Sequence, residues 1–266
     1  TLSSSSAASD VYKRQVVSDA TVTVNDADAT AITAAELSAI GGATTGTVTV
    51  TNAVAITGTA AEVTAALVTA GTLVVVSDAA VTITGNPTIT ELNAIAAKTT
   101  GVVTATLAAD SLSNLGSLTT ASTDAITVTV NDADAAALTA ANLSTLGGKT
   151  SGTVTVTNAV AITGDHDQLT AALVTAGTKV VVSDATVTVN DADATAITAA
   201  ELSTLGGATT GTVTVTNAVN VTGTADQAIA ALVTTDTLVA VSDATWVPLG
   251  KFSLKAVADK VISVGA

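Results

Sequence analysis

The chain lacks cysteine and methionine, and it has a single Phe, Tyr and Trp among 266 residues. Without aromatic side chains, any core must be built from Val, Ile, Leu and Ala. An acidic chain without cysteine suits an exported bacterial protein that avoids stray disulfides, although a cytosolic protein could look the same. Glycan recognition usually needs aromatic platforms, and none precedes Trp246 within the repeats described below.

Positive charge is also scarce, with 8 Lys and Arg against 22 acidic residues and a net charge of −14. Between Val16 and Thr245 the only lysines are Lys98, Lys149 and Lys179. No basic patch is available to neutralise phosphates, so nucleic acid is not an expected partner.

Long apolar runs are absent, because polar residues interrupt every window of membrane-spanning length. Membrane insertion is therefore not expected. The mean hydropathy of +0.60 is nevertheless too high for a disordered acidic chain. We expect a folded protein.

Catalytic groups are few. The single histidine, His166, lies in GDHDQL, where the pattern predicts the first turn of a helix. We interpret it as a solvated substitution, because no cysteine or second histidine could share metal binding or base chemistry. The serines lack a histidine partner. Gly-Gly pairs such as Gly41-Gly42 follow helices, the wrong order for cradling phosphate. We therefore predict no enzyme activity, no cofactor, and no catalytic, cofactor-binding or metal-binding residues.

What the sequence does contain is repetition. Val16–Thr47 (the first repeat) matches Val181–Thr212 (its twin) except at positions 39 and 40. Short repeats start at Val48, Val154 and Val213, and each is followed 26 residues later by another start. Long repeats, such as residues 180–212, alternate with the short ones, so that two repeats make a unit of about 58 residues. Eight or nine repeats are visible, and the weakest covers Val103–Thr123.

The pattern predicts that each repeat consists of a strand, a corner, a second strand and a helix. VTVTN and VAITG alternate β-branched residues with a period of two, as strands with one buried face do. Asx-Ala pairs such as Asn52-Ala53 form the corners, where we expect the Asx side chain to bond its own backbone. The corner pairs begin at Asn52, Asp78, Asn158, Asp184, Asn217 and Asp243.

An Ala-rich helix follows the strands. In TAAEVTAALVTAG, the residues Val63, Ala66, Leu67 and Ala70 share one helical stripe. Thr59 is the predicted N-cap with Glu62 three residues later, and Gly71 is the predicted stop. The Gly-Gly pairs at 41–42, 147–148 and 206–207 are expected to end the other helices.

A unit this small cannot bury its apolar face alone and must stack on its copies. The sequence therefore predicts an α/β repeat solenoid over residues 16–245, with parallel strands and one short Ala-rich helix in each repeat. We interpret residues 1–15 as a non-native or disordered leader. Residues 246–266, with Trp246 and Phe252, are either a C-terminal cap or the start of a truncated next domain.

Three Asn-Asp-Ala-Asp segments, at 25–28, 131–134 and 190–193, stand between the second strand and the helix of the long repeats. As turns, they would place acidic residues at a helix N-terminus, where the helix dipole favours them. As oxygen-rich loops, they could bind Ca²⁺, which needs six to eight oxygen ligands. Adjacent copies are too far apart to share an ion, so we favour the turn.

Threonine rows suggest one further alternative. Stacked strands would align outward threonines into a flat array like that of ice-binding solenoids. The array is interrupted where alternate repeats carry Val75, Val181 or Ala240. The outward threonines are Thr49, Thr51, Thr155, Thr157, Thr214 and Thr216. Ice binding is therefore a minor alternative.

Runs such as NAIAAKTTGVVTA (93–105) and AVAITGTAAEVTAAL (53–67) resemble the repeats of very large adhesin-like surface proteins of marine cyanobacteria and other aquatic bacteria. The resemblance implies an extracellular or cell-surface location and a role as stalk, spacer or adhesive surface. Cell-surface or matrix components are the partners it implies, and self-association is left open. A calcium-dependent or glycan-binding module is the alternative function.

Overall fold

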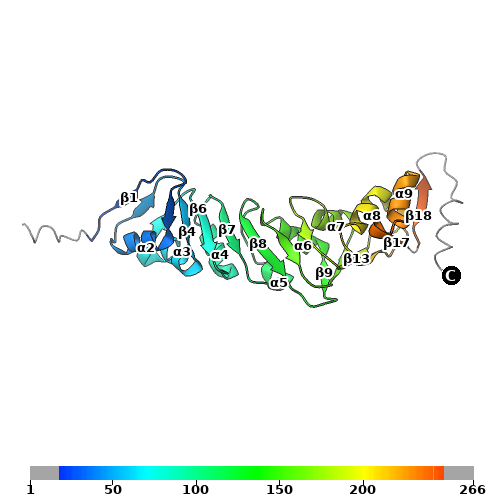
Figure 1. Cartoon of the computed structure of the whole chain (residues 1–266), viewed down its shortest axis with the longest axis horizontal. Coiled ribbons are helices and arrows are strands. Elements are labelled where there is room, and N and C mark those ends of the chain that lie inside the picture. The colour runs from blue at the N-terminus through cyan, green and yellow to red at the C-terminus, as the bar shows by residue number, and fades with distance from the viewer. Residues whose placement is uncertain (1–17, 242, 249–266) are drawn as a thin grey trace, which may run out of the picture. The chain divides into compact units, whose positions relative to one another are not determined.

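The computed structural model of the protein describes residues 18–241 and 243–248. It confirms an α/β fold whose paired strands run parallel, in several sheets, with eight helices in the described ranges (Figure 1). Residues 1–15 and Phe252 lie outside the described residues, so the interpretations of both ends stay predictions. The chain divides into two compact units, Thr1–Thr106 and Leu107–Ala266.

Unit 1 contains the first repeat and the repeats that follow it as far as β7. Its helices are α2 (Ala34–Gly42), α3 (Ala60–Leu67) and α4 (Ile89–Ala96), with a 3-10 turn η1 at Ala70–Thr72. Its strands are β1 (Val22–Val24), β2 (Ala31–Thr33), β3 (Val48–Val50), β4 (Ala55–Thr59), β5 (Val74–Val75), β6 (Ala80–Thr84) and β7 (Val103–Thr106).

The pairing in unit 1 links each segment to the next copy along the chain. Val22 of β1 pairs with Val48 of β3, which pairs with Val74 of β5. A second sheet has the order β2-β4-β6-β7. Neighbouring strands thus belong to successive repeats.

Unit 2 repeats the same elements. Its helices are α5 (Leu112–Leu115), α6 (Ala140–Gly147), α7 (His166–Leu173), α8 (Ala199–Gly206) and α9 (Ala225–Leu232), with η2 at Thr235–Thr237. Its strands are β8 (Ala125–Val130), β9 (Ala137–Thr139), β10 (Val154–Val156), β11 (Ala161–Gly164), β12 (Val180–Val181), β13 (Thr186–Val189), β14 (Ala196–Thr198), β15 (Val213–Val215), β16 (Asn220–Gly223), β17 (Val239–Val241) and β18 (Thr245–Pro248). Within the unit, strands pair in the orders β8-β10-β12, β9-β11-β13-β15-β17 and β14-β16-β18.

The long repeat 180–212 carries three strands, whereas the sequence predicted two. In the twin, β12 and β13 pair with β10 and β11 of the preceding short repeat. The next short repeat pairs its strands β15 and β16 with β13 and β14. The central strand β13 therefore pairs with strands of both the preceding and the next short repeat. Strands β12 and β14 lie at the edges of their sheets. The additional strand has only three residues and adjoins the Ala-rich run, which hides its alternation from pattern reading.

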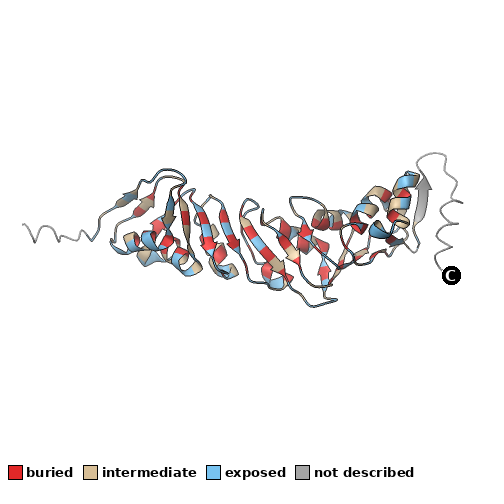
Figure 2. Cartoon of the chain, in the orientation of Figure 1, coloured by how far each residue is buried: buried red, intermediate tan, exposed pale blue. Residues whose placement is uncertain are grey.

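The core consists of inward-facing aliphatic side chains from strands and helices. In β3 and β10 the valines are buried while the intervening threonine is half exposed, so burial alternates with the pleat (Figure 2). Val63, Ala66 and Leu67 of α3 are fully buried, which confirms that part of the predicted stripe. Ala70 is exposed and lies in η1, so it does not belong to the stripe.

Helix starts agree with the sequence prediction. Thr59 caps α3, and Glu62 completes a capping box by accepting from the Thr59 amide at 2.8 Å. A capping box is also present at the N-terminus of α2, α4, α7, α8 and α9. These hydrogen bonds lower the pKa of Glu62 below its usual value, the backbone bond from Thr59 first and the hydroxyl bond second. The caps thus define where each helix begins.

Helix ends differ from the prediction. Helix α3 ends at Leu67, three residues before η1, so Gly71 is not its stop. The Gly-Gly pairs do end helices, but Gly148 and Gly207 keep right-handed backbones at the C-cap. The first glycine of a pair has a different role. A Cβ on Gly206 would lie 2.2 Å from the carbonyl oxygen of Thr237 in the next repeat. Glycine is needed there because two backbones approach each other closely.

Candidate functional site

The three Asn-Asp-Ala-Asp loops each carry three side chains with oxygen atoms. Each connects two strands: β1 to β2, β8 to β9 and β13 to β14. The prediction that they lie directly before the helix is therefore wrong, because the short third strand intervenes. Their acidic residues do not act on the helix of their own repeat.

The last aspartate of each loop bonds to the following repeat. Asp193 Oδ1 accepts a hydrogen bond from the Ala218 amide at 3.0 Å, and the Ala194 amide donates to the Ala218 carbonyl at 2.8 Å. Asn217 donates its side-chain amide to the Asp191 carbonyl. The predicted bonding of this Asn to its own backbone is therefore wrong. Equivalent bonds join Asp28 to Ala53, Asp134 to Ala159, Asn52 to Asp26 and Asn158 to Asp132.

The first aspartate of the loop bonds in the opposite direction. Asp132 Oδ2 accepts from the Leu112 amide at 2.7 Å, and Asp191 Oδ2 accepts from the His166 amide at 2.8 Å. Both amides belong to the first residue of the preceding helix. A carboxylate at that position is favoured by the helix dipole. The predicted dipole contact thus exists, but it reaches the helix of the preceding repeat.

The hydrogen bonds of the loop carboxylates are relevant to the alternative that these loops bind calcium. Carboxylate oxygens of the loops are hydrogen bonded to backbone amides, and in the described ranges no three His, Cys, Asp or Glu side chains gather as a metal site. A calcium ion would need six to eight oxygens. What the loop geometry can do is join one repeat to both of its neighbours.

His166 is hydrogen bonded to Asp191 across two repeats. Its Nδ1 is 2.7 Å from Asp191 Oδ1, and its side chain is only 16% exposed, so the predicted solvated position is wrong. Burial by itself would lower the pKa of His166. The hydrogen bond and charge of Asp191, with smaller contributions from Asp167 and Glu201, outweigh burial and raise the pKa. Because the ring contacts a carboxylate that also binds the helix N-terminus, the pair is a structural contact.

The Thr-Thr-Gly segments are a feature that the sequence analysis noted only as part of a family pattern. The Thr209 hydroxyl is buried, donates to the Ala185 carbonyl at 2.7 Å and accepts from the Gly211 amide at 3.0 Å. A Cβ on Gly211 would lie 2.2 Å from that same carbonyl oxygen. Thr44, Thr99 and Thr150 make the same contacts. The motif, which is Thr-Ser-Gly at residues 150–152, recurs before β3, β7, β10 and β15 and was the signal for this second connection between repeats.

The threonine rows are interrupted as the sequence predicted. Across the strands, Thr49 stands beside Val75, Thr155 beside Val181 and Thr214 beside Ala240. The threonine that directly follows each of β3, β10 and β15 also bonds within the protein. Its hydroxyl donates to the carbonyl of the preceding strand at 3.3 to 3.4 Å, from Thr51 to Val24, Thr157 to Val130 and Thr216 to Val189.

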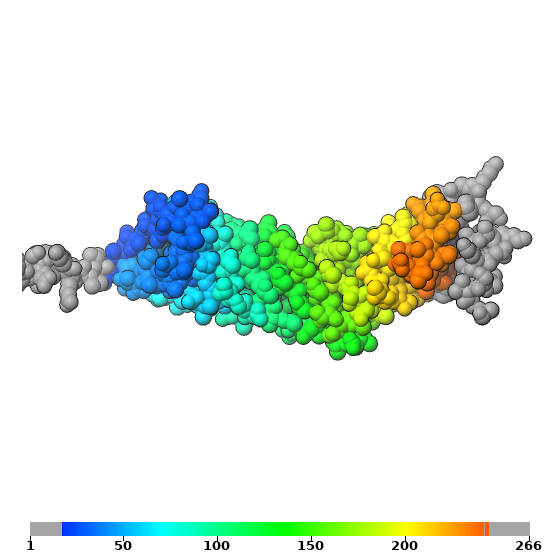
Figure 3. Space-filling view, viewed as in Figure 1, coloured from blue at the N-terminus to red at the C-terminus, as the bar shows by residue number. Residues whose placement is uncertain are grey.

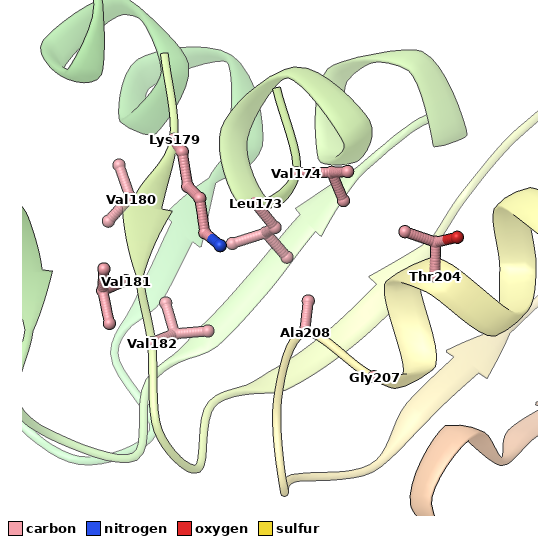
Figure 4. Close-up of a pocket in the computed structure, with 9 residues that line it drawn as sticks. All are labelled: Leu173, Val174, Lys179, Val180, Val181, Val182, Thr204, Gly207 and Ala208. Atoms are coloured by element: carbon pink, nitrogen blue, oxygen red, sulfur yellow. The ribbon is translucent and has the colours of Figure 1, made fainter. Parts of the chain in front are cut away.

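A surface hollow of about 390 Å³ lies in unit 2 between α7, β12 and the end of α8 (Figure 4). Leu173 and Val182 form apolar walls, and Thr204 stands at the rim. Lys179 is the charged side chain among the lining residues, and it extends past Leu173 (Figure 4). A single lysine without a neighbouring acid, base or nucleophile provides no acid–base pair for catalysis.

No described helix combines the length and apolar character that a membrane crossing needs. Comparison with protein-family models, curated proteins and solved structures found no match.

Proposed function

We propose that residues 16–245 are a solenoid segment of an extracellular bacterial surface protein and act as a stalk, spacer or adhesive surface. One observation carries the proposal: the polar groups that repeat most regularly are used to bond each repeat to the next. Asp193, Asn217 and Thr209 all make such bonds in unit 2. A chain whose distinctive residues join copies to one another gains length and stiffness with each added copy.

The sequence period supports the same proposal. The first repeat and its twin differ at two positions, so the segment has been copied with few changes. A specific binding or catalytic site would need particular side chains at one place, whereas a spacer needs the same contacts at every junction. The calcium-dependent, glycan-binding and ice-binding alternatives have no comparable support from the described contacts.

The proposal is tested by varying the number of repeats on a cell surface. Variants with one, two or three copies of residues 154–212 are displayed behind a common anchor, with a fluorophore at the free end. We expect the height of the fluorophore above the surface to increase by equal steps. A Gly/Ser linker of matched length is the control, because the reach of a flexible chain grows only with the square root of its length. Equal behaviour of repeats and linker would reject the spacer function.

A further inference from the structure

Strand β12 has a free edge in the interior of unit 2. It pairs with β10 on one side, where Val154 lies opposite Val180, and it is the last strand of its sheet. The next short repeat pairs its strand β15 with β13, so the outer edge of β12 is not paired with any described strand. The described chain continues as far as β18, and in Figure 3 the orange atoms of these later residues follow the yellow-green and yellow atoms of residues 180–208. The free edge therefore results from a change of pairing partner and not from an end of the chain.

The hollow of about 390 Å³ lies along this edge. Residues 179–182 form one side of it, and Gly207 and Ala208 at the end of α8 form the opposite side (Figure 4). Val181 is 45% exposed, and the amide of Val182 has no hydrogen bond to a described residue. A strand edge with an unpaired amide and an exposed apolar side chain is a template for pairing with another extended segment.

Lys179 gives this edge a charge that the equivalent strands lack. The strand registers place Lys179 at the position of Leu73 in unit 1 and of Leu238 later in unit 2. Because the stack accepts leucine at this position, the packing of the repeats does not require lysine. Lys179 is exposed, and the ion pairs found in the described ranges do not include it. Its positive charge is therefore available to a carboxylate from outside the chain.

We propose that the hollow beside β12, the edge groove, binds an extended, acidic peptide segment of a partner protein. The peptide adds as a strand to β12 and accepts a hydrogen bond from the Val182 amide. A β-branched residue of the peptide packs on Val181, as neighbouring side chains do across paired strands. An Asp or Glu side chain of the peptide contacts Lys179, so the groove selects acidic partners.

This assignment rests on the proposed function, since it gives the adhesive surface a location and a partner chemistry. The edge groove differs from the contacts between repeats, because its lysine is absent from the equivalent strands and its occupant comes from another protein. Strand addition and ion pairing also make separate demands on the occupant. A small anion can pair with Lys179, but only an extended backbone can pair with the edge of β12.

The test uses the full chain and three synthetic pentapeptides. Each pentapeptide alternates valine and threonine, has an acetylated and an amidated end, and carries one glutamate at the first, third or fifth position. Hydrogen exchange at the Val182 amide is measured by NMR at increasing peptide concentration, and the shift of its signal gives the dissociation constant. We expect at least one pentapeptide to slow this exchange by at least about tenfold, as for an amide that joins a paired strand. Acetylated and amidated glutamate alone is the control for anion binding and should leave the exchange unchanged.

Variants at position 179 make the result specific. Lys179→Leu introduces the residue of the equivalent strands and should weaken binding of the pentapeptide about threefold, as expected for loss of an exposed ion pair. Lys179→Glu should weaken it about tenfold and should instead bind a pentapeptide in which lysine replaces glutamate. Lys98→Leu removes a lysine from unit 1 and is the matched control, with binding at Val182 unchanged.

Two results would overturn the edge groove. One is exchange at Val182 that none of the three pentapeptides slows, and the other is equal binding of the glutamate pentapeptide by the unaltered chain and by Lys179→Glu. Either result would leave intact the equal height steps expected for copies of residues 154–212. Failure of the edge groove can therefore be told apart from failure of the spacer function.

Discussion

At the scale of single residues, three alanines hold a left-handed backbone. Ala29, Ala135 and Ala194 have φ of 60°, 59° and 64°, and each follows the last aspartate of an Asn-Asp-Ala-Asp loop. A left-handed backbone disfavours alanine by about 1 to 2 kcal/mol. The same conformation directs the alanine amide at the carbonyl of the next repeat, 2.8 Å away in each loop. The contact between repeats therefore compensates for local strain.

Ala194→Gly tests this strain. Glycine removes the left-handed penalty of about 1 to 2 kcal/mol and adds about 0.5 to 1 kcal/mol of chain entropy, so unit 2 should become more stable by about 0.5 kcal/mol. Urea unfolding measures the change. Ala192→Gly in the same loop is the control and should destabilise, because Ala192 is absent from the described residues with positive φ. Equal destabilisation by both variants would contradict the assignment of strain.

The aspartate before Ala194 tests whether the loop works through hydrogen bonding or through charge. Asp193→Asn keeps an oxygen that can accept from Ala218, whereas Asp193→Ala removes it. We expect the alanine variant to lose about 1 kcal/mol of unfolding free energy and the asparagine variant to lose much less. Urea midpoints of both variants give the answer, with Asp236→Ala as a control for removing an exposed charge. A calcium-dependent rise in stability that both variants abolish would favour a metal loop instead.

His166 should make unit 2 sensitive to pH. Its pKa is raised in the folded protein, so protonation stabilises the fold. This contribution is fully present below the unfolded pKa of about 6.5 and is lost as pH rises through the higher folded value. The unfolding free energy should therefore fall from mildly acidic to mildly alkaline pH. In His166→Gln the fall should be absent, and persistence of the full pH dependence in that variant would show that other groups cause it.

At the scale of elements, the glycines at the helix ends determine how closely successive repeats approach. Gly206→Ala would bring a Cβ to 2.2 Å from the Thr237 carbonyl oxygen, whereas at Gly207 the nearest atoms are 3.5 Å away. Overpacking typically costs about 1 to 3 kcal/mol. Alanine otherwise favours a helix over glycine by up to about 1 kcal/mol.

The adjacent glycines thus provide a matched pair. Gly206→Ala should lower the thermal midpoint of unfolding, and Gly207→Ala should leave it unchanged or raise it slightly. Circular dichroism during heating measures both. If the two variants behave alike, close approach of the backbones at Gly206 is not what selects glycine.

Sequence patterns predicted the elements better than the links between them. The strand alternation, the corner positions and the Thr59 cap follow from local rules, so they could be read from one segment at a time. The third strand Ala196–Thr198 and the pairing of His166 with Asp191 could not, because both depend on a neighbouring repeat. The expectation for Gly71 was wrong for a similar reason: helix α3 ends before it, and the turn η1 that contains Gly71 contacts α2 of the preceding repeat.

At the scale of the whole molecule, the proposed spacer becomes longer with each repeat that is added to the sequence. Each parallel strand adds about 4.8 Å along a stack, so a unit of two repeats adds about 10 Å. The scarcity of aromatic residues agrees with the proposed spacer, which would need small aliphatic side chains at regular positions. Stability should likewise be a sum of repeat and neighbour contributions.

Small-angle X-ray scattering on chains with one, two and three copies of residues 154–212 tests this claim most directly. The account predicts that the maximum dimension rises linearly, by about 10 Å for each added unit. A radius of gyration that instead follows the scaling of compact globules, with chain length to the power of about 0.38, would contradict it.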